Sequence, residues 1–203
     1  MSEKAELGKQ KAKSLRARTA ICKATISCLI SYGYGETSLQ RVAQKAEFSK
    51  GALQHHFPSK EDLMVATADT LLARPLAKPD DDEDQPNTVE EMLLLTWVKF
   101  TNTGAYRALL EILCATRTDL KLRDRVSEKL KAWNAALDQQ AMEVYRAKSG
   151  DDADTVAILT MSRAMMRGLV IQHSYSTDPE ETLQLVQRWI ALIAPMLELR
   201  KAP

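Results

Sequence analysis

The sequence predicts an all-α protein in which a three-helix N-terminal domain precedes a larger helical domain. Apolar residues recur at spacings of three and four through most of the chain, and no segment shows the alternating pattern of a strand. Residues typical of helix starts and helix ends punctuate this pattern and divide it into about nine helices. We place the first domain at residues 1–59 and the second at residues 60–203.

The composition is that of an ordinary globular chain. Of the 203 residues, 45% are hydrophobic and 27% are charged, which supports a packed core rather than disorder. No apolar run approaches the ~20 residues of a membrane span, and no apolar segment follows the N-terminal lysines, so we expect a cytoplasmic protein without a membrane partner. Cys22, Cys28 and Cys114 have neither CxxC nor metal-site spacing and are expected to be reduced thiols.

The net charge of +1 conceals an uneven distribution. Residues 1–60 contain 11 Lys and Arg against 4 Asp and Glu, a balance of +7, whereas the remaining residues balance at −6. A solvated lysine-rich surface is one explanation of this charge. Combined with the helix pattern described next, the charge indicates a surface for the phosphates of a nucleic acid.

The first helix is expected from about Ser14 or Arg16 to Tyr32, and Gly33 ends it. It should brace the domain through apolar residues that share one face at spacings of three and four: Ile21, Ala24, Cys28 and Leu29.

Two short helices joined by a tight turn follow. The second helix is expected after Thr37, whose hydroxyl would cap it while Gln40 completes a capping box. The turn at residues 47–49 leads to a third helix at residues 50–56, with Ser49 as its N-cap. The residues expected to face inward are Leu39, Val42, Ala43, Ala46, Leu53 and Phe57.

A fourth helix is expected at residues 60–72, because Pro58 breaks the chain and Ser59 with Asp62 forms a capping box. Residues 74–87 contain three prolines and five consecutive acids and are predicted to form a linker. The acidic run lacks the alternation and the glycine of a calcium loop, so we assign no metal.

The outer face of the third helix suits the major groove of DNA. Lys50 can donate to guanine, Gln54 or Gln40 can bracket adenine, and His55 can donate to a guanine acceptor. The small residues Gly51 and Ala52 let the backbone come close.

Other residues are better suited to phosphates. Ser38, His56 and Lys60 lie at or beside helix starts, where backbone N–H groups already favour an anion. The full set of residues expected to contact DNA is Thr37, Ser38, Gln40, Arg41, Ser49, Lys50, Gly51, Ala52, Gln54, His55, His56 and Lys60.

Residues 18–63 resemble the DNA-binding domain of the TetR family of transcriptional regulators. The elements that carry this resemblance are Arg18, Ile21, Ala24, Gly33-Tyr34, Thr37-Ser38, Val42-Ala43, Ala46, Ser49-Lys50-Gly51, Leu53, His56-Phe57 and Ser59-Lys60-Glu61-Asp62-Leu63. The resemblance covers about a quarter of the chain. It implies a helix-turn-helix domain followed by a domain for effector binding and dimerisation.

The chain departs from the family pattern at three positions. Glu47 stands where the family usually has glycine, and a left-handed conformation there would cost roughly 1 to 2 kcal/mol. Gln54 replaces a tyrosine that commonly contacts phosphate, and Arg41 replaces an acid. Arg41 would add a phosphate contact.

Five further helices are expected in the second domain. Thr88 and Glu91 form a capping box at the start of the first of them, and Asp178-Pro179 is a strong start signal for the last. The expected ranges are 88–104, 105–115, 120–147, 152–175 and 179–199, and Gly150 closes the third.

The last helix is apolar over about half its circumference, which one neighbouring helix cannot bury. An intersubunit four-helix bundle and a two-fold homodimer would satisfy this surface, and the alternative is burial of both final helices within one subunit. The residues expected at the interface are Leu185, Val186, Trp189, Ile190, Leu192, Ile193 and Met196.

A small-molecule effector is expected among the remaining helices, where apolar and aromatic residues with scattered polar tips occur. They are Trp97, Thr101, Tyr106, Leu110, Cys114, Tyr145, Met161, Met165 and His173. Each of them is also an ordinary core residue, and the methionines fill irregular space well.

The resemblance therefore implies a homodimeric repressor that binds a palindromic operator on double-stranded DNA and is released by an effector. A regulator responding to thiol oxidation is an alternative, with Cys114 as its candidate residue. An enzyme is disfavoured, since the sequence has no phosphate loop, HExxH motif or nucleophile elbow, and no catalytic residue or cofactor is assigned.

Overall fold

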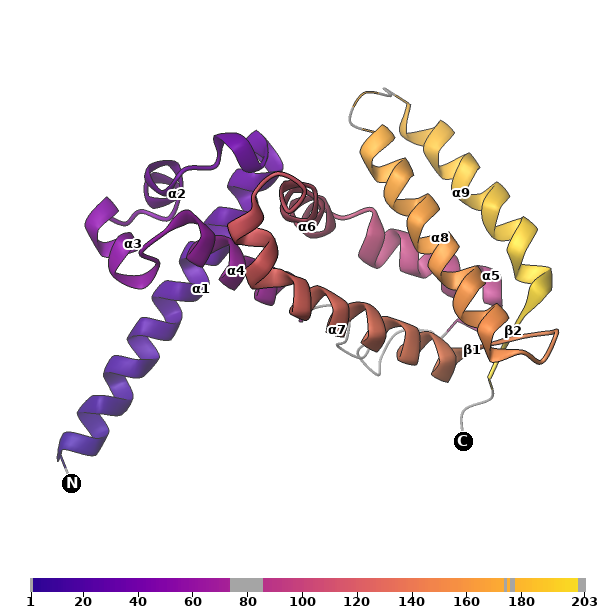
Figure 1. Ribbon diagram of the computed structural model, residues 1–203, viewed down its shortest axis with the longest axis horizontal. Helices are drawn as coiled ribbons and strands as arrows, with labels where there is room; N and C mark the ends of the chain where they lie inside the picture. Colours follow the sequence, from indigo (N-terminus) through magenta and orange to yellow (C-terminus); the bar gives the residue numbers. More distant parts are fainter. Residues whose placement is uncertain (1, 74–85, 174, 176–177, 201–203) are drawn as a thin grey trace. The chain divides into compact units, whose positions relative to one another are not determined.

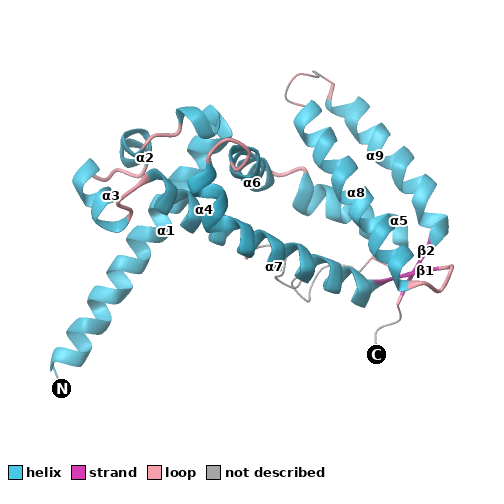
Figure 2. Ribbon diagram, in the orientation of Figure 1, coloured by secondary structure: helices cyan, strands magenta, loops and turns pink. Residues whose placement is uncertain are grey.

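The computed structural model describes residues 2–73, 86–173, 175 and 178–200, with no side-chain detail before residue 8. Helices dominate these residues, which confirms the predicted all-α class (Figures 1 and 2). The nine α-helices of the described part are α1 (Ser2–Glu36), α2 (Leu39–Lys45), α3 (Lys50–His56), α4 (Lys60–Leu72), α5 (Val89–Thr96), α6 (Gly104–Ala115), α7 (Leu120–Val144), α8 (Asp152–Gln172) and α9 (Pro179–Ile193).

The chain forms two compact units. The first comprises residues 1–74 and 107–128, and the second comprises residues 75–106 and 129–203. The first unit therefore holds α1 to α4 together with most of α6 and the first turns of α7. Residues 74–85 of the predicted linker lie outside the described residues.

Two short strands correct the expectation that the chain has none. β1 (Tyr145–Ala147) pairs antiparallel with β2 (Leu197–Leu199), and the Arg200 guanidinium donates to the Tyr145 carbonyl at 3.1 Å. The sequence pattern predicts both segments as the ends of long helices. Three residues are too few for alternation to be recognised, and the pairing partner lies about fifty positions away.

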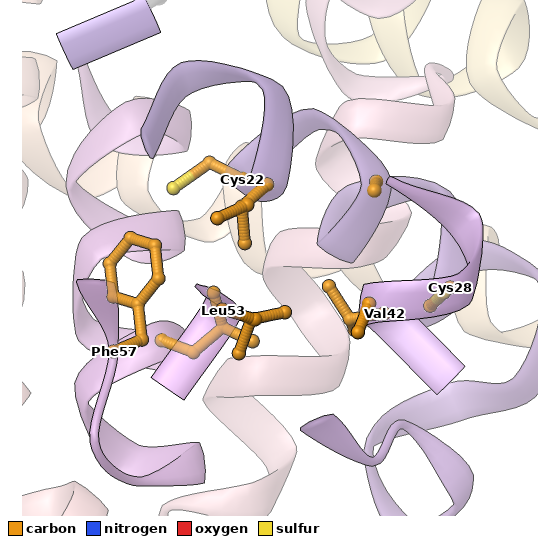
Figure 3. Close-up of a cluster of buried hydrophobic side chains, with 9 residues drawn as sticks. Cys22, Cys28, Val42, Leu53 and Phe57 are labelled. Atoms are coloured by element: carbon orange, nitrogen blue, oxygen red, sulfur yellow. The ribbon is translucent and has the colours of Figure 1, made fainter. Parts of the chain in front are cut away.

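The core of the helix-turn-helix confirms the predicted inner faces (Figure 3). Leu53 and Phe57 of the α3 segment are buried together with Val42 of α2 and with the inner face of α1. The complete buried cluster is Ile21, Cys22, Ala24, Cys28, Val42, Ala43, Leu53, Phe57 and Leu63. This cluster holds α2 and α3 against α1. Each of the two has only seven residues and would not be stable as an isolated helix.

Most of the predicted helix starts are confirmed. Ser49 caps α3, and capping boxes at Ser59 and Thr88 open α4 and α5. Asp178 caps α9, which has Pro179 in its first turn.

The predicted cap of α2 is wrong by one residue. Ser38 caps α2, its side chain accepting from the Arg41 N–H at 3.2 Å. Gly33 has a left-handed φ of 70°, and after this turn Thr37 is fully buried with its hydroxyl donating to the Gly33 carbonyl at 2.7 Å. The backbone turn therefore decides which of two adjacent hydroxyls caps the helix.

The start of the first helix was also predicted wrongly. α1 begins at Ser2 instead of near Ser14 or Arg16. Apolar periodicity marks only the part of α1 that packs on the core, and residues 8–13 are exposed on every side. The lysines, glutamine and alanine of this stretch are good helix formers that make no apolar face.

Candidate nucleic-acid interface

The outer face of α3 carries polar and small side chains. Lys50, Gly51, Ala52, Gln54 and His55 are all exposed. No atom lies within 4 Å of the position that a side chain on Gly51 would occupy, so a partner can approach the backbone closely there. The Ser49 hydroxyl oxygen accepts from the Ala52 N–H at 3.1 Å and fixes the first turn of this helix.

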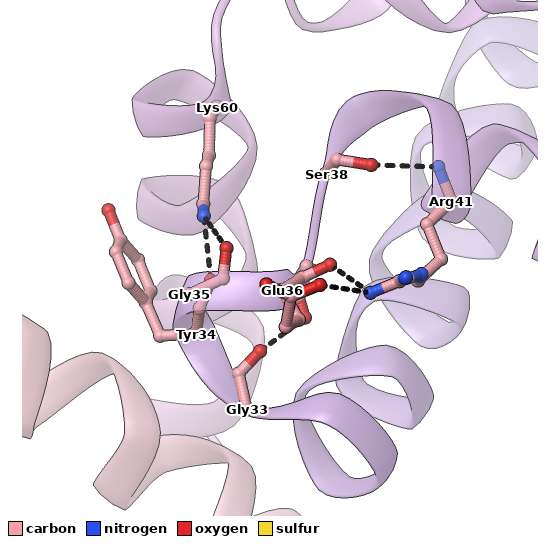
Figure 4. A network of polar contacts seen from close by, with 8 residues as sticks. Gly33, Tyr34, Gly35, Glu36, Ser38, Arg41 and Lys60 are labelled. Atoms are coloured by element: carbon pink, nitrogen blue, oxygen red, sulfur yellow. Dashed lines mark hydrogen bonds and ion pairs between the residues drawn. The ribbon is translucent and has the colours of Figure 1, made fainter.

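The start of α2 lies close by in sequence and adds exposed Ser38 and Gln40. Thr37 does not belong to this surface, because it is fully buried. Arg41 is half-buried and is already engaged, since its guanidinium donates to the Glu36 carbonyl and carboxylate and lies over the Tyr32 ring (Figure 4). It therefore braces the turn before α2.

Lys60 also has an internal role that the sequence did not indicate. Its ammonium group donates to the Tyr34 carbonyl at 2.6 Å and to the Gly35 carbonyl at 3.2 Å (Figure 4). It lies 4.2 Å from the centre of the Tyr34 ring, and burial lowers its pKa. A phosphate would have to compete with two carbonyl oxygens for this ammonium group.

His56 is half-buried at the end of α3. Burial lowers the pKa of its imidazole, and the nearby His55 and Arg18 lower it further. A lowered pKa favours the neutral imidazole, which can still donate a hydrogen bond to a phosphate. The His56 carbonyl accepts from the Arg18 guanidinium at 2.8 Å, and that guanidinium lies over the Phe57 ring.

The turn between α2 and α3 has the strained conformation expected at Glu47. Glu47 has a φ of 59°, the left-handed region that favours glycine. The Phe48 N–H donates to the Ala43 carbonyl at 2.9 Å, so the chain turns back directly onto α2. Both short helices thus keep the close spacing of a helix-turn-helix despite the missing glycine.

Residues far along the chain hold the α1–α2 turn in place. The Tyr34 N–H donates to the Glu111 carboxylate at 2.8 Å, and the Tyr34 hydroxyl donates to the Asp119 carboxylate at 2.6 Å. Arg125 pairs with Asp62 at 2.6 Å beside the start of α4. All of these residues belong to the first unit. The sequence pattern could not find these contacts, since the partners are 63 to 85 positions apart.

The residues expected to bind an effector divide between the two units. Leu110 and Cys114 belong to the first unit, in which Leu110 is buried and Cys114 is exposed. The others belong to the second unit: Trp97, Thr101, Tyr106 and Tyr145 are buried, Met165 and His173 are half-buried, and Met161 is exposed.

The second unit contains buried and half-buried polar groups, of which the sequence did not single out Arg167 and Trp133. The Arg167 Nε donates to the Tyr106 hydroxyl at 2.8 Å. The Trp133 Nε1 and the His173 Nδ1 are buried and have no hydrogen-bond partner among the described residues. A buried N–H group without an acceptor is rare, and these atoms are places to look for contacts with a bound molecule.

The final helix buries one part of its apolar surface and leaves another part exposed. Val186, Ile190 and Ile193 are buried within the second unit. Leu185 and Leu192 remain 45% and 62% exposed, which leaves a face of α9 uncovered in the single chain. Trp189 is half-buried, and its Nε1 donates to the Ser162 hydroxyl of α8 at 3.1 Å.

No helix in the described ranges is long and apolar enough to cross a membrane. The same ranges contain no group of three or more His, Cys, Asp or Glu side chains that could hold a metal ion.

Comparison with known proteins identifies the helix-turn-helix. The family described as "Bacterial regulatory proteins, tetR family" matches residues 21–67, which include all of α2 and α3. Residues 21–67 therefore form a DNA-binding domain of the TetR family. The family is one of transcriptional regulators rather than enzymes.

Two relatives extend the similarity beyond this domain. An uncharacterized HTH-type transcriptional regulator of Mycobacterium tuberculosis is 26% identical over 85% of this chain and 90% of the relative. The HTH-type transcriptional regulator CymR of Pseudomonas putida is 24% identical over 84% of the chain and 86% of CymR.

Solved structures share the TetR fold. A TetR-family transcriptional regulator from Rhodococcus sp. has a TM-score of 0.67 at 19% identity and covers 88% of this chain and 99% of its own. A transcriptional regulator from Saccharomonospora viridis, solved in complex with choline, has a TM-score of 0.64 at 18% identity and covers 92% and 99%.

Proposed function

We propose that this TetR-family protein is a homodimeric repressor that binds a palindromic operator and is released by a small-molecule effector. The observation that carries the proposal is the outer face of α3, where Lys50, Gln54 and His55 are exposed around a Gly51 that nothing covers. Their side chains match the donors and acceptors of base edges in the major groove. The buried Leu53 and Phe57 hold this face outward.

The proposed roles differ along this surface. Lys50 and Gln54 read bases, and His55 donates to a guanine acceptor. Ser38 and the first N–H groups of α2 hold a phosphate, as helix starts do. Arg41 and Lys60 position this surface through their hydrogen bonds to the α1–α2 turn. Each contacts phosphate only through N–H groups that are not already bonded to the turn.

A two-fold dimer is supported by uncovered faces on α8 and α9. Leu185 and Leu192 are seven positions apart on α9 and share one side of it. On α8, Met161 is 57% exposed, and Gly168 has no atom within 4 Å of the place a side chain would fill. Large exposed apolar side chains beside a small residue suit close packing against the same helices of a second copy.

Release by an effector follows from linkage. The effector binds more tightly to the form of the dimer that does not fit the operator, and it thereby lowers the affinity for operator DNA. Operator DNA must then lower the affinity for the effector by the same factor. The choline complex of the structural neighbour supports a small molecule as the effector of this chain. The unpaired Trp133 Nε1 and the half-buried Arg167 are the groups we propose to contact it.

The test of base reading is Lys50→Ala. Operator duplexes would be selected by this protein from a random library, and affinities measured by fluorescence anisotropy on the selected and on random duplexes. The substitution should cost ~1 to 3 kcal/mol on the operator, roughly 5- to 150-fold, and much less on random DNA. Lys121→Ala, an exposed lysine on α7, is the matched control and should leave both affinities unchanged. Equal losses on both duplexes would refute base reading by Lys50.

The dimer has its own test. The double variant Leu185→Glu, Leu192→Glu should sediment as a monomer, because it places charges in the proposed interface. The control pair Gln184→Glu, Gln187→Glu alters exposed positions on another side of the same helix and should sediment as the wild type does. A monomeric wild-type protein at micromolar concentration would refute the dimer.

A further inference from the structure

From residue 8 on, the N-terminal half of α1 contributes no buried side chain to the core of the first unit. Figure 1 shows this part, in indigo, continuing as a helix beyond α2, α3 and α4. Burial in α1 begins only at Ile21, and no side chain between residues 8 and 20 is buried. We name residues 8–20 the arm. No side chain of the arm is therefore needed to fill the core of the first unit.

The arm is uniformly basic. Residues 8–35 contain six Lys and Arg and no Asp or Glu. Lys9, Lys13 and Arg16 follow one another at spacings of four and three, which places them on one face of the helix, and all three are exposed. Lys23 is also exposed and continues this face toward the domain.

This arrangement does not favour the free helix. Like charges three or four positions apart repel each other and destabilise a helix. A helix that is polar on all sides also gains nothing from burial. Neutralising Lys9, Lys13 and Arg16 would remove the repulsion, so the arm has the electrostatic properties of a segment that binds a polyanion.

The base of the arm is joined to the proposed recognition helix. Arg18 donates to the carbonyl of His56, the last residue of α3, and its guanidinium covers the Phe57 ring. The arm and α3 thus start from a common point in the first unit. At ~1.5 Å per residue, the basic face from Lys9 to Lys23 is roughly 21 Å long, which corresponds to about six base pairs of a duplex.

We propose that the arm is a second DNA-binding surface, which lies along the phosphate backbone beside the half-site read by α3. The inference rests on the proposed binding of DNA through α3. Lys9, Lys13 and Arg16 contact phosphates and read no bases, so this surface adds affinity and length of contact without sequence preference.

The test uses the triple variant Lys9→Gln, Lys13→Gln, Arg16→Gln in the full-length protein. Binding to a fluorescein-labelled 40-base-pair duplex of random sequence would be followed by anisotropy at a series of KCl concentrations. The slope of log K against log salt is negative, and its magnitude should decrease by ~2.7 for each arm bound, since each lost phosphate contact removes about 0.9. The control triple Lys121→Gln, Arg123→Gln, Lys148→Gln removes the same types of charge from exposed positions elsewhere and should keep the wild-type slope.

Duplex length gives a second readout. Shortening the selected operator so that it ends at the half-sites should reduce wild-type affinity to that of the arm variant, and should change the arm variant little. The proposal is overturned if the arm variant keeps the wild-type salt slope for DNA. It is also overturned if the variant binds DNA as the wild type does and has lost affinity only for anionic phosphatidylserine vesicles. These outcomes are separable from failure of the proposed function, in which Lys50→Ala would bind the operator as tightly as the wild type does.

Discussion

Replacing Glu47 by glycine should stabilise the protein. Glu47 has a φ of 59° in the turn between α2 and α3, and its side chain is exposed. Holding a residue with a Cβ in this region costs ~1 to 2 kcal/mol. Glycine avoids that cost but gains more freedom in the unfolded chain, which offsets roughly 0.5 to 1 kcal/mol of it. The expected net gain is therefore about 0.5 to 1 kcal/mol in the free energy of unfolding.

Urea unfolding at 25 °C, followed by circular dichroism, measures this gain. With an m-value of about 2 kcal/mol/M, the midpoint should rise by roughly 0.25 to 0.5 M while m stays constant. Glu47→Ala is the essential control, because it removes the same carboxylate and keeps a Cβ in the left-handed conformation. Alanine should leave the midpoint close to that of the wild type.

Two results would refute the reasoning. If alanine stabilises as much as glycine, the carboxylate and not the backbone is responsible for the cost. If glycine destabilises, the left-handed turn at Glu47 is not strained. Either result would also remove the explanation of why the family favours glycine at this position.

Three further outcomes follow from the bonds of the first unit and from its thiols. Tyr34→Phe should lower the free energy of unfolding by ~1 to 2 kcal/mol, because it removes the donor to Asp119; a calorimetric melt unchanged from wild type would contradict this. Asp119→Asn, which can still cap α7, should cost a similar ~1 to 2 kcal/mol at pH 7. The bond to Tyr34 lowers the pKa of Asp119, so this difference should be complete above the ordinary value of 3.8 and should vanish as pH falls through the lowered folded-state pKa; a difference that persists at pH 2 would exclude the charge as its source. One thiol, Cys114, should react with Ellman's reagent in the folded protein and three after denaturation, because burial raises the pKa of Cys22 and Cys28; rapid reaction of all three in the folded protein would contradict this.

Local patterns predicted the helix-turn-helix well because its structure is determined locally. Ser49 and Ser59 cap the helices that follow them, and Leu53 and Phe57 are buried as their spacing indicates. A cap needs only a hydroxyl and a free N–H two or three residues on, so the sequence contains all the necessary information.

Contacts between distant residues could not be predicted in this way. Nothing near Tyr34 in the sequence indicates that Glu111 and Asp119 accept its two hydrogen bonds. The internal bonds of Lys60 depend on the same turn, so a residue that looks like a phosphate ligand is also a structural one. The choice between Thr37 and Ser38 as the cap of α2 likewise depends on the conformation of Gly33.

The supports of the α1–α2 turn determine how the DNA-binding specificity of this protein could be transplanted. A chimeric regulator made by joining residues 1–73 to the remainder of another family member would lose Glu111, Asp119 and Arg125, and Tyr34 and Asp62 would meet foreign side chains. The transferable module is discontinuous, since the first unit consists of residues 1–74 together with residues 107–128. Chimeras that carry both segments should retain the operator preference of the donor, and those that carry only the first should fold with a loosened recognition surface.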